Sequence, residues 1–223
     1  MHEFSLDAGA TELYLIRHAD AKPHDDDTDI DVTYRDARLS SIGRSQAASV
    51  AERFATDDIA AIVASPSRRT LETAGYIAEA TATAITTDER LREVHIGEFD
   101  RPLEPGSGTI AGAVRARLDR LADTALRDGG WSGIPGTEAS DAVRARMRAA
   151  TDDAIAAHPG KRVLLISHAG AINAYFADLL GMKRDFFFPA ANTSISVVRA
   201  RSTHRLLIRL NDVAHLRALS RRA

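Results

Sequence analysis

The sequence predicts an α/β fold, a three-layer α/β/α sandwich around a mainly parallel central sheet. Two short apolar runs, residues 13–16 and 163–166, are typical of strands buried on both faces, and each leads into a histidine. Between them, apolar runs alternate with stretches of helical spacing, as in parallel strands joined by helices. Since the ligand crevice of such sheets lies just past the carboxyl ends of the strands, His18 and His168 are expected to meet there.

Each element between the two histidines follows from a local signal. Ser40 or Ser41 can cap a helix whose apolar positions recur at helical spacing. Pro66 closes the next strand and stands where the first turn of the following helix tolerates a proline. The elements expected in this part are a helix from Ser40 or Ser41 to about residue 55, a strand at 59–64, a helix from Pro66 to about residue 80 and a short strand at 83–86.

The pattern changes at residues 102–136, where glycine and proline gather around one helical piece at 110–127. We interpret this stretch as a helical insertion that packs over the sheet edge and could form a wall of the site. The remaining elements expected are a helix from Thr137 or Ser140 to about 157, the strand at 163–166, a helix at 171–180 stopped by Gly181, and a hairpin of strands 194–199 and 205–210 at one edge of the sheet.

The expected organisation is one domain over residues 11–215, with tails at 1–10 and 216–223. The arginine-rich end is expected to be frayed. The hairpin leaves an edge strand on which the edge strand of a second copy could pair, so a homodimer is one possible assembly.

Composition excludes several classes of function. The chain has 223 residues, a formal net charge of -2 and no cysteine, which excludes disulfides, thiolate chemistry and cysteine-bound zinc. The near-neutral charge gives no pull toward nucleic acid or an anionic membrane. The start of the chain has no signal-peptide pattern, and no apolar run approaches the length of a membrane span. A cytoplasmic protein without nucleic-acid or membrane partners is therefore expected.

Four local motifs carry the chemical signal. They are Arg17-His18-Ala19-Asp20 after an apolar run, the segment from Ser65-Pro66-Ser67-Arg68-Arg69 to Ala74, the segment from Asp88 through Leu91-Arg92-Glu93 to Gly97-Glu98, and Ser167-His168-Ala169-Gly170. Weaker echoes are Leu39-Ser40 with Gly43 and Gln46, Gly136-Thr137-Glu138 with Arg146, and Asn192-Thr193-Ser194.

With these motifs in this order, residues 11 to 198 resemble the histidine phosphatase superfamily, whose fold is phosphoglycerate-mutase-like. Within it, the chain is similar to branch 1, of the broad-specificity phosphatase type. The resemblance implies that His18 attacks phosphorus and becomes a phosphohistidine, while Arg17, Arg69 and His168 hold the phosphate. It also implies that Glu93 protonates the leaving alkoxide and then takes a proton from water.

The chemistry of these residue types agrees with that assignment. Arginine forks match phosphate oxygens, and a histidine is a competent nucleophile near neutral pH. The start of the helix after His168 would add backbone donors to the phosphate. The role of Glu93 requires it to be protonated at the first step, and the sequence leaves that state open.

Each assignment has competitors within the sequence. Arg68 stands beside Arg69, which is preferred because the family arginine lies four positions after the serine. Glu89 and Glu98 compete with Glu93, which fits the family pattern best. His95 is expected to be structural or part of the pocket wall.

The acidic loop at residues 25–31 has the carboxylate spacing of a calcium loop. It places Ile30 where glycine is needed and Asp36 where glutamate is needed, so no metal is expected there. A solvated lid beside the site is preferred, and no cofactor is expected.

Some positions depart from the family pattern. Ala19 replaces the usual glycine, Ala21 replaces a serine or threonine, and Pro23-His24 stands where mutases have Trp-Asn. These differences favour a metal-independent phosphomonoester hydrolase acting on a small phosphorylated metabolite. The alternatives are a 2,3-bisphosphoglycerate-dependent phosphoglycerate mutase, a phosphatase for phosphohistidine on proteins and, from another class, a phosphate-binding or interaction module with a weakened site.

Overall fold

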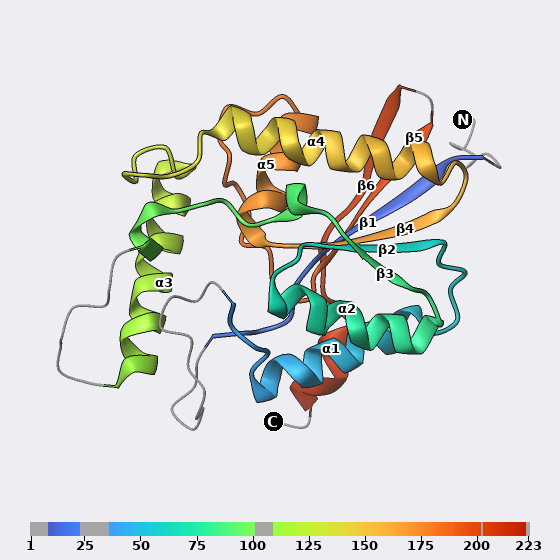
Figure 1. The fold of residues 1–223 in the computed structure, drawn as a ribbon, viewed down its shortest axis with the longest axis horizontal. Helices are drawn as coiled ribbons and strands as arrows, with labels where there is room; N and C mark the ends of the chain where they lie inside the picture. Colours follow the sequence, from blue (N-terminus) through green and yellow to red (C-terminus); the bar gives the residue numbers. More distant parts are fainter. Residues whose placement is uncertain (1–8, 23–35, 101–108, 202, 222–223) are drawn as a thin grey trace.

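The computed structural model describes residues 9–22, 36–100, 109–201 and 203–221. Its centre is a six-stranded sheet in the order β3-β2-β4-β1-β5-β6 (Figure 1). Only β5 runs against the others, so the predicted mainly parallel sheet is confirmed. The strands are β1 (Thr11–Arg17), β2 (Ala61–Ala64), β3 (Ile85–Thr87), β4 (Arg162–Ser167), β5 (Ile195–Arg201) and β6 (His204–Asp212).

Helices cover both faces of this sheet, which confirms the three-layer prediction. Helices α1 and α2 lie below the strands in Figure 1, and α4 and α5 lie above them. Their bounds are α1 (Ser41–Phe54), α2 (Arg68–Thr81), α4 (Ser140–Ala157) and α5 (Ala169–Leu179). Two starts differ from expectation: α2 begins after Pro66, with Ser67 as its N-cap, and α5 begins two residues earlier than predicted.

Alternate residues of β1 enter the two halves of the core. Leu13 and Leu15 pack into the cluster that contains Met147 and other residues of α4 and α5. Tyr14 and Ile16 pack on the opposite face, with residues of α1 and α2. Side chains of β4 alternate in the same way, so both strands are buried on both faces, as their continuous apolar runs predict.

The pairing of β1 with β4 places the two histidines side by side. The strands are parallel, and Arg17 lies opposite Ser167 at their carboxyl ends. The backbone N–H of His18 then donates to the carbonyl of Ser167 at 3.0 Å. The expected meeting of residues 18 and 168 therefore follows directly from strand register.

Helix α3 (Ile110–Asp128) forms where the insertion predicts a helix, but its expected position over the sheet edge is wrong. The sheet edges are β3 and β6, whereas α3 stands beyond the carboxyl ends of the strands, at the left in Figure 1. Among the described helices and strands, it packs extensively against none. The other expectation, that this helix could form a wall of the site, is confirmed, because Leu118, Leu121 and Ala125 line the cavity described below.

The end of the described chain also differs from expectation. Strands β5 and β6 form the predicted hairpin, with β6 at the edge. After it, residues 214–221 form a 3-10 helix against α1 rather than a frayed tail, and Ser49 Oγ donates to the carbonyl of His215 at 2.7 Å. In the part of the chain that is described, no helix is both long and apolar enough to cross a membrane. The acidic loop 25–31 lies outside the described residues.

Candidate active site

His18 follows β1 and is 3% exposed. Its Nδ1 lies 2.7 Å from the carbonyl oxygen of Ala19, and Arg69 Nε donates to its Nε2 at 3.2 Å. Since a guanidinium can only donate, Nε2 must be the acceptor, and the ring proton belongs on Nδ1. This bonding leaves Nε2 with the lone pair that a nucleophile requires.

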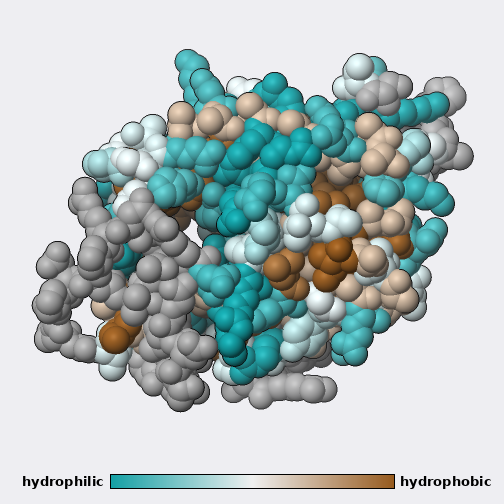
Figure 2. Space-filling view, in the orientation of Figure 1, coloured by the Kyte–Doolittle hydropathy of each residue, from teal (hydrophilic) through white to brown (hydrophobic). Residues whose placement is uncertain are grey.

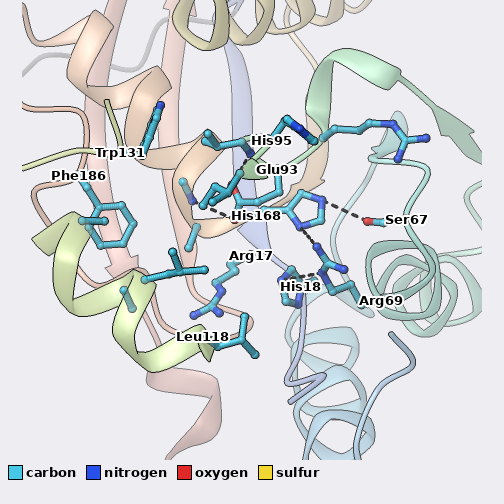
Figure 3. A pocket seen from close by; sticks show the side chains of 18 of the residues that line it. Arg17, His18, Ser67, Arg69, Glu93, His95, Leu118, Trp131, His168 and Phe186 are labelled. Atoms are coloured by element: carbon cyan, nitrogen blue, oxygen red, sulfur yellow. Dashed lines mark hydrogen bonds between the residues drawn. The ribbon is translucent and has the colours of Figure 1, made fainter. Parts of the chain in front are cut away.

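His168 is the N-cap residue of α5 and is 1% exposed. Arg69 Nη2 donates to its Nδ1 at 3.2 Å, so its proton belongs on Nε2. That nitrogen lies 2.9 Å from Ser65 Oγ and 3.2 Å from Ser67 Oγ. One guanidinium therefore bridges two neutral histidines, whose ring centres are 5.1 Å apart (Figure 3).

The surroundings of both rings favour their neutral form. Burial, followed by the positive charges of Arg69 and Arg17, lowers the pKa of His18 well below its usual range. Burial and Arg69 lower the pKa of His168 in the same direction, and its neighbour His18 adds to the effect. Both rings are therefore uncharged near neutral pH, while two arginines next to them supply positive charge.

The two arginines come from different elements. Arg17 is the last residue of β1, and its Nη1 donates to the carbonyl of Ala190 at 2.7 Å. Arg69 is the second residue of α2 and is 5% exposed. The competing Arg68 instead forms an ion pair with Glu72 at 3.2 Å, one helical turn along α2. The structure thus brings Arg69, not Arg68, to the histidines.

Glu93 reaches the same place from the segment that follows β3. Its Oε1 accepts hydrogen bonds from the backbone N–H groups of Val94 and Ala171, both at 2.9 Å, and its Oε2 accepts one from Gly170 at 3.2 Å. A Cβ on Gly170 would lie 2.7 Å from Glu93 Oε1, so only glycine allows this approach. Two of the N–H groups at the start of α5 that were expected to serve the phosphate, those of Gly170 and Ala171, are therefore occupied by Glu93.

A clamp that the sequence analysis did not include among the site residues holds the segment carrying Glu93. Arg146, from α4, donates to the carbonyls of Arg90 at 2.6 Å, Arg92 at 2.7 Å and Glu93 at 3.2 Å. It also forms two hydrogen bonds to the carboxylate of Glu138, at 2.8 and 3.0 Å. The signal was present as the weak echo of Glu138 with Arg146, but its target could not be read from the sequence.

The competing acids lie elsewhere. Glu89 is exposed and pairs with Arg92, and Glu98 lies 4.0 Å from Arg120. His95 lines the cavity, and its backbone N–H donates to Glu138 at 3.3 Å. Asn192, which the sequence offered only within a weak echo and without a role, donates its side-chain amide to the carbonyl of His18 at 3.0 Å.

A cavity of about 540 Å³ connects these groups. Figure 3 shows the histidines and Arg69 on one side of it, with Trp131, Phe186 and Leu118 on the other. The polar and charged residues that line it are Arg17, His18, Lys22, Ser67, Arg69, Arg92, Glu93, His95, His168 and Asn192. The arrangement offers a buried nucleophilic nitrogen, cationic anion holders and one carboxyl group around a single space.

Comparisons with known proteins agree on one family. The family model described as histidine phosphatase superfamily (branch 1) matches residues 13–213. A probable phosphoglycerate mutase GpmB of Yersinia enterocolitica is 31% identical over 148 residues, which span 66% of this chain and 65% of that protein. A putative phosphoserine phosphatase 2 of Hydrogenobacter thermophilus is 26% identical over 93% of this chain and 98% of its own length.

A solved structure extends this agreement to the fold. The native structure of the mycobacterial glucosyl-3-phosphoglycerate phosphatase has a TM-score of 0.70 and 27% sequence identity. The similarity covers 92% of this chain and all of that one.

Proposed function

The chain belongs to the histidine phosphatase superfamily, branch 1, and from this premise we propose that it is a phosphomonoester hydrolase acting through a phosphohistidine. Its substrate is a small phosphorylated metabolite, and the reaction requires no metal. The observation that carries the proposal is Arg69 donating to both His18 Nε2 and His168 Nδ1, each at 3.2 Å, within one cavity. Relatives named as phosphoserine phosphatase and glucosyl-3-phosphoglycerate phosphatase support hydrolysis.

In the first step, Nε2 of His18 attacks phosphorus and the bond from phosphorus to the ester oxygen breaks. Arg17 and Arg69 hold the phosphate oxygens, whose charge they stabilise better than bulk water would. His168 joins them as a donor when its Nδ1 takes up a proton, which the bound anion favours. Glu93 donates a proton to the departing oxygen, which leaves as an alcohol. The Nδ1 contact to Ala19 at 2.7 Å keeps the ring oriented throughout.

In the second step, water attacks the phosphohistidine and the phosphorus–nitrogen bond breaks. Glu93, now a carboxylate, takes the proton from that water, and inorganic phosphate leaves. Its three backbone N–H donors hold the carboxyl group in one place for both steps. The same lone pair on His18 is then restored for the next cycle.

Hydrolysis is favoured over phosphoryl transfer to a second substrate because residues near the nucleophile are small and apolar. Ala19 and Ala21 are both buried where the family pattern has glycine and a hydroxyl-bearing residue. A mutase must retain its phosphohistidine and exclude water, which requires a cap fitted to its substrate. Transfer to 3-phosphoglycerate is the second candidate, since relatives named as probable phosphoglycerate mutases match the chain.

The experiment is hydrolysis of 4-nitrophenyl phosphate with EDTA present, by the wild type and by the His18→Ala and His18→Gln variants. We expect activity that survives chelation and falls by about 10³-fold or more in both variants. The control is His204→Ala, because His204 is exposed on β6. An acid-labile phosphate on the wild type, absent from the His18 variants, would identify the intermediate.

Two results would overturn the proposal. Activity retained in His18→Ala and His18→Gln would remove the nucleophile. A phosphoenzyme that resists water but passes its phosphate to 3-phosphoglycerate would make the protein a mutase.

A further inference from the structure

The cavity is much larger than a phosphate group needs. At about 540 Å³ it falls within the size range of pockets that enclose a whole small molecule. The histidines, Arg69 and Glu93 occupy one side of it, and the space beyond them must hold the body of the ester (Figure 3). The walls of that space therefore report on the chemistry of the substrate.

The opposite wall is apolar. Leu118, Leu121 and Ala125 lie one helical turn apart on a single face of α3 and line the cavity. Trp131 and Phe186 extend the same wall, as Figure 3 shows for both rings. We define these five side chains as the apolar wall.

Hydrogen bonds fix the apolar wall in position. The indole N–H of Trp131 donates to the carbonyl of Glu138 at 3.1 Å. The carbonyl of Gly129, the residue after α3, accepts from the backbone N–H groups of Asp185 at 2.8 Å and Phe186 at 3.1 Å. Leu121 and Ala125 are only 7% and 8% exposed, whereas Leu118 is half-buried, so Leu118 is the residue that this wall presents most openly to a ligand.

The cations farther out in the cavity are already paired. Lys22 Nζ lies 2.5 Å from Asp119 Oδ1, and Arg92 pairs with Glu89. In the described part of the lining, these two are the lysine and arginine side chains outside the phosphate-holding set. A second anionic group on the substrate would compete with Asp119 or Glu89 for these exposed cations, whereas an apolar body would gain from its transfer out of water.

We propose that the substrate is a phosphate monoester whose alcohol carries an uncharged apolar body, aromatic or branched, and that the apolar wall determines this specificity. This inference rests on the proposed phosphatase function. It excludes as preferred substrates the esters with a carboxylate or a second phosphate close to the scissile bond.

The experiment compares three primary alkyl esters, so that the leaving groups are similar: 2-phenylethyl phosphate, glycerol 3-phosphate and 3-phosphoglycerate. We expect kcat/KM for the phenylethyl ester to exceed both others by about 30-fold, from the apolar area that it buries. Leu118→Asn should reduce this preference to about 3-fold, with little change for glycerol 3-phosphate. The matched control is Leu126→Asn, on the same helix but outside the cavity lining.

A binding measurement separates failure of this inference from failure of the proposed function. Trp131 is the single tryptophan of the chain, so its fluorescence reports a ligand at the apolar wall. We expect 2-phenylethylphosphonate to change this fluorescence and to bind about 30-fold more tightly than ethylphosphonate, even in His18→Ala.

Equal binding of the two phosphonates, or a preference for 3-phosphoglycerate, would overturn the inference about substrate specificity. The phosphatase proposal would still stand if His18 forms a phosphohistidine. Conversely, tight binding of phenylethylphosphonate with no hydrolysis and no phosphoenzyme would support the apolar wall as a binding surface and overturn the phosphatase proposal.

Discussion

The two sides of the cavity are built in different ways. On the phosphate side, His18, His168, Arg69 and Glu93 come from four separate parts of the chain. Directional hydrogen bonds join Arg69 to both histidines and hold Glu93 on the backbone of α5. On the other side, the apolar wall comes from one helix and two aromatic rings, and its contact with a ligand is non-directional. Loss of one hydrogen-bonded partner leaves the remaining buried polar groups unsatisfied, which is costly. Loss of one apolar contact lowers the binding free energy only in proportion to the apolar area that is no longer buried. Under the functions proposed above, the residues that govern the rate of reaction are separate from those that govern the choice of substrate.

The largest expected effect is on the bridging guanidinium. Arg69→Gln should lower kcat for aryl phosphate hydrolysis by about 10²- to 10³-fold, because this residue contacts both histidines and, in the proposed mechanism, also holds the phosphate. Arg68→Gln is the matched control, since the side chain of Arg68 pairs with Glu72 in α2 rather than with the histidines. Similar losses in the two variants would contradict the assignment of Arg69.

Glu93→Gln should lower kcat by about 10²-fold for alkyl phosphates and much less for 4-nitrophenyl phosphate. The difference arises because nitrophenolate leaves without a proton, whereas an alkoxide does not. The measurement is kcat for an alkyl phosphate and for 4-nitrophenyl phosphate in Glu93→Gln, with Glu98→Gln as the control. A loss that is independent of the leaving group would show that Glu93 acts only in positioning.

Arg146→Met should lower kcat for alkyl phosphates by about 10-fold, because it releases the carbonyls of residues 90, 92 and 93. Arg146 is a positioning residue, so the change should appear as the same leaving-group dependence that Glu93→Gln shows. The control is Arg144→Met, on the same helix, which breaks a comparable clamp on Asp185. If both variants lose stability but only Arg146→Met shifts the leaving-group dependence, a merely structural role is excluded.

The smallest effect concerns acid stability. His18 and His168 have lowered pKa values in the folded protein, so the unfolded chain binds protons more tightly. The free energy of unfolding should therefore be insensitive to these groups above about pH 7.5 and fall once the pH drops below about 6.5, by up to about 1.4 kcal/mol per pH unit for each histidine. Urea denaturation between pH 7.5 and 5 measures this slope.

The same titration tests the contrast between the two sides of the cavity. His18→Gln should remove one histidine's contribution to the dependence of the unfolding free energy on pH. Leu118→Asn should change the unfolding free energy by the same amount at every pH. An unchanged slope in His18→Gln would mean that His18 is not held neutral.

The phosphate side could largely be predicted from the sequence, since its residues stand at fixed offsets from strands that the sequence identifies. Continuous apolar runs locate β1 and β4, and parallel pairing then brings Arg17 level with Ser167. The resemblance of the second motif to the family pattern also selected Arg69 over Arg68, and Arg69 is the arginine that lies against the histidines.

What escaped prediction depends on contacts between elements with no shared register. The stripe on α3 specified an apolar face, and the sequence offered it as a wall of the site, which the lining confirms, but the expected place of the helix over the sheet edge was wrong. Likewise, Arg146 and Asn192 bind carbonyl groups, which every residue possesses, so no pattern of side chains marks their targets. Glycine at position 170 is needed by Glu93, which lies far away in the sequence.

The pairing of β1 with β4 has a consequence for how the protein is made. During synthesis His18 leaves the ribosome well before His168, and at usual rates of translation the gap is roughly 10–30 s. Until β4 arrives, β1 lacks its parallel neighbour, and the nascent chain cannot assemble the two-histidine cluster. The closing of so long a loop is also slow during refolding from denaturant. Catalytic activity should therefore recover later than the helical circular dichroism signal. The delay between the two signals measures how long the pairing of β1 with β4 takes.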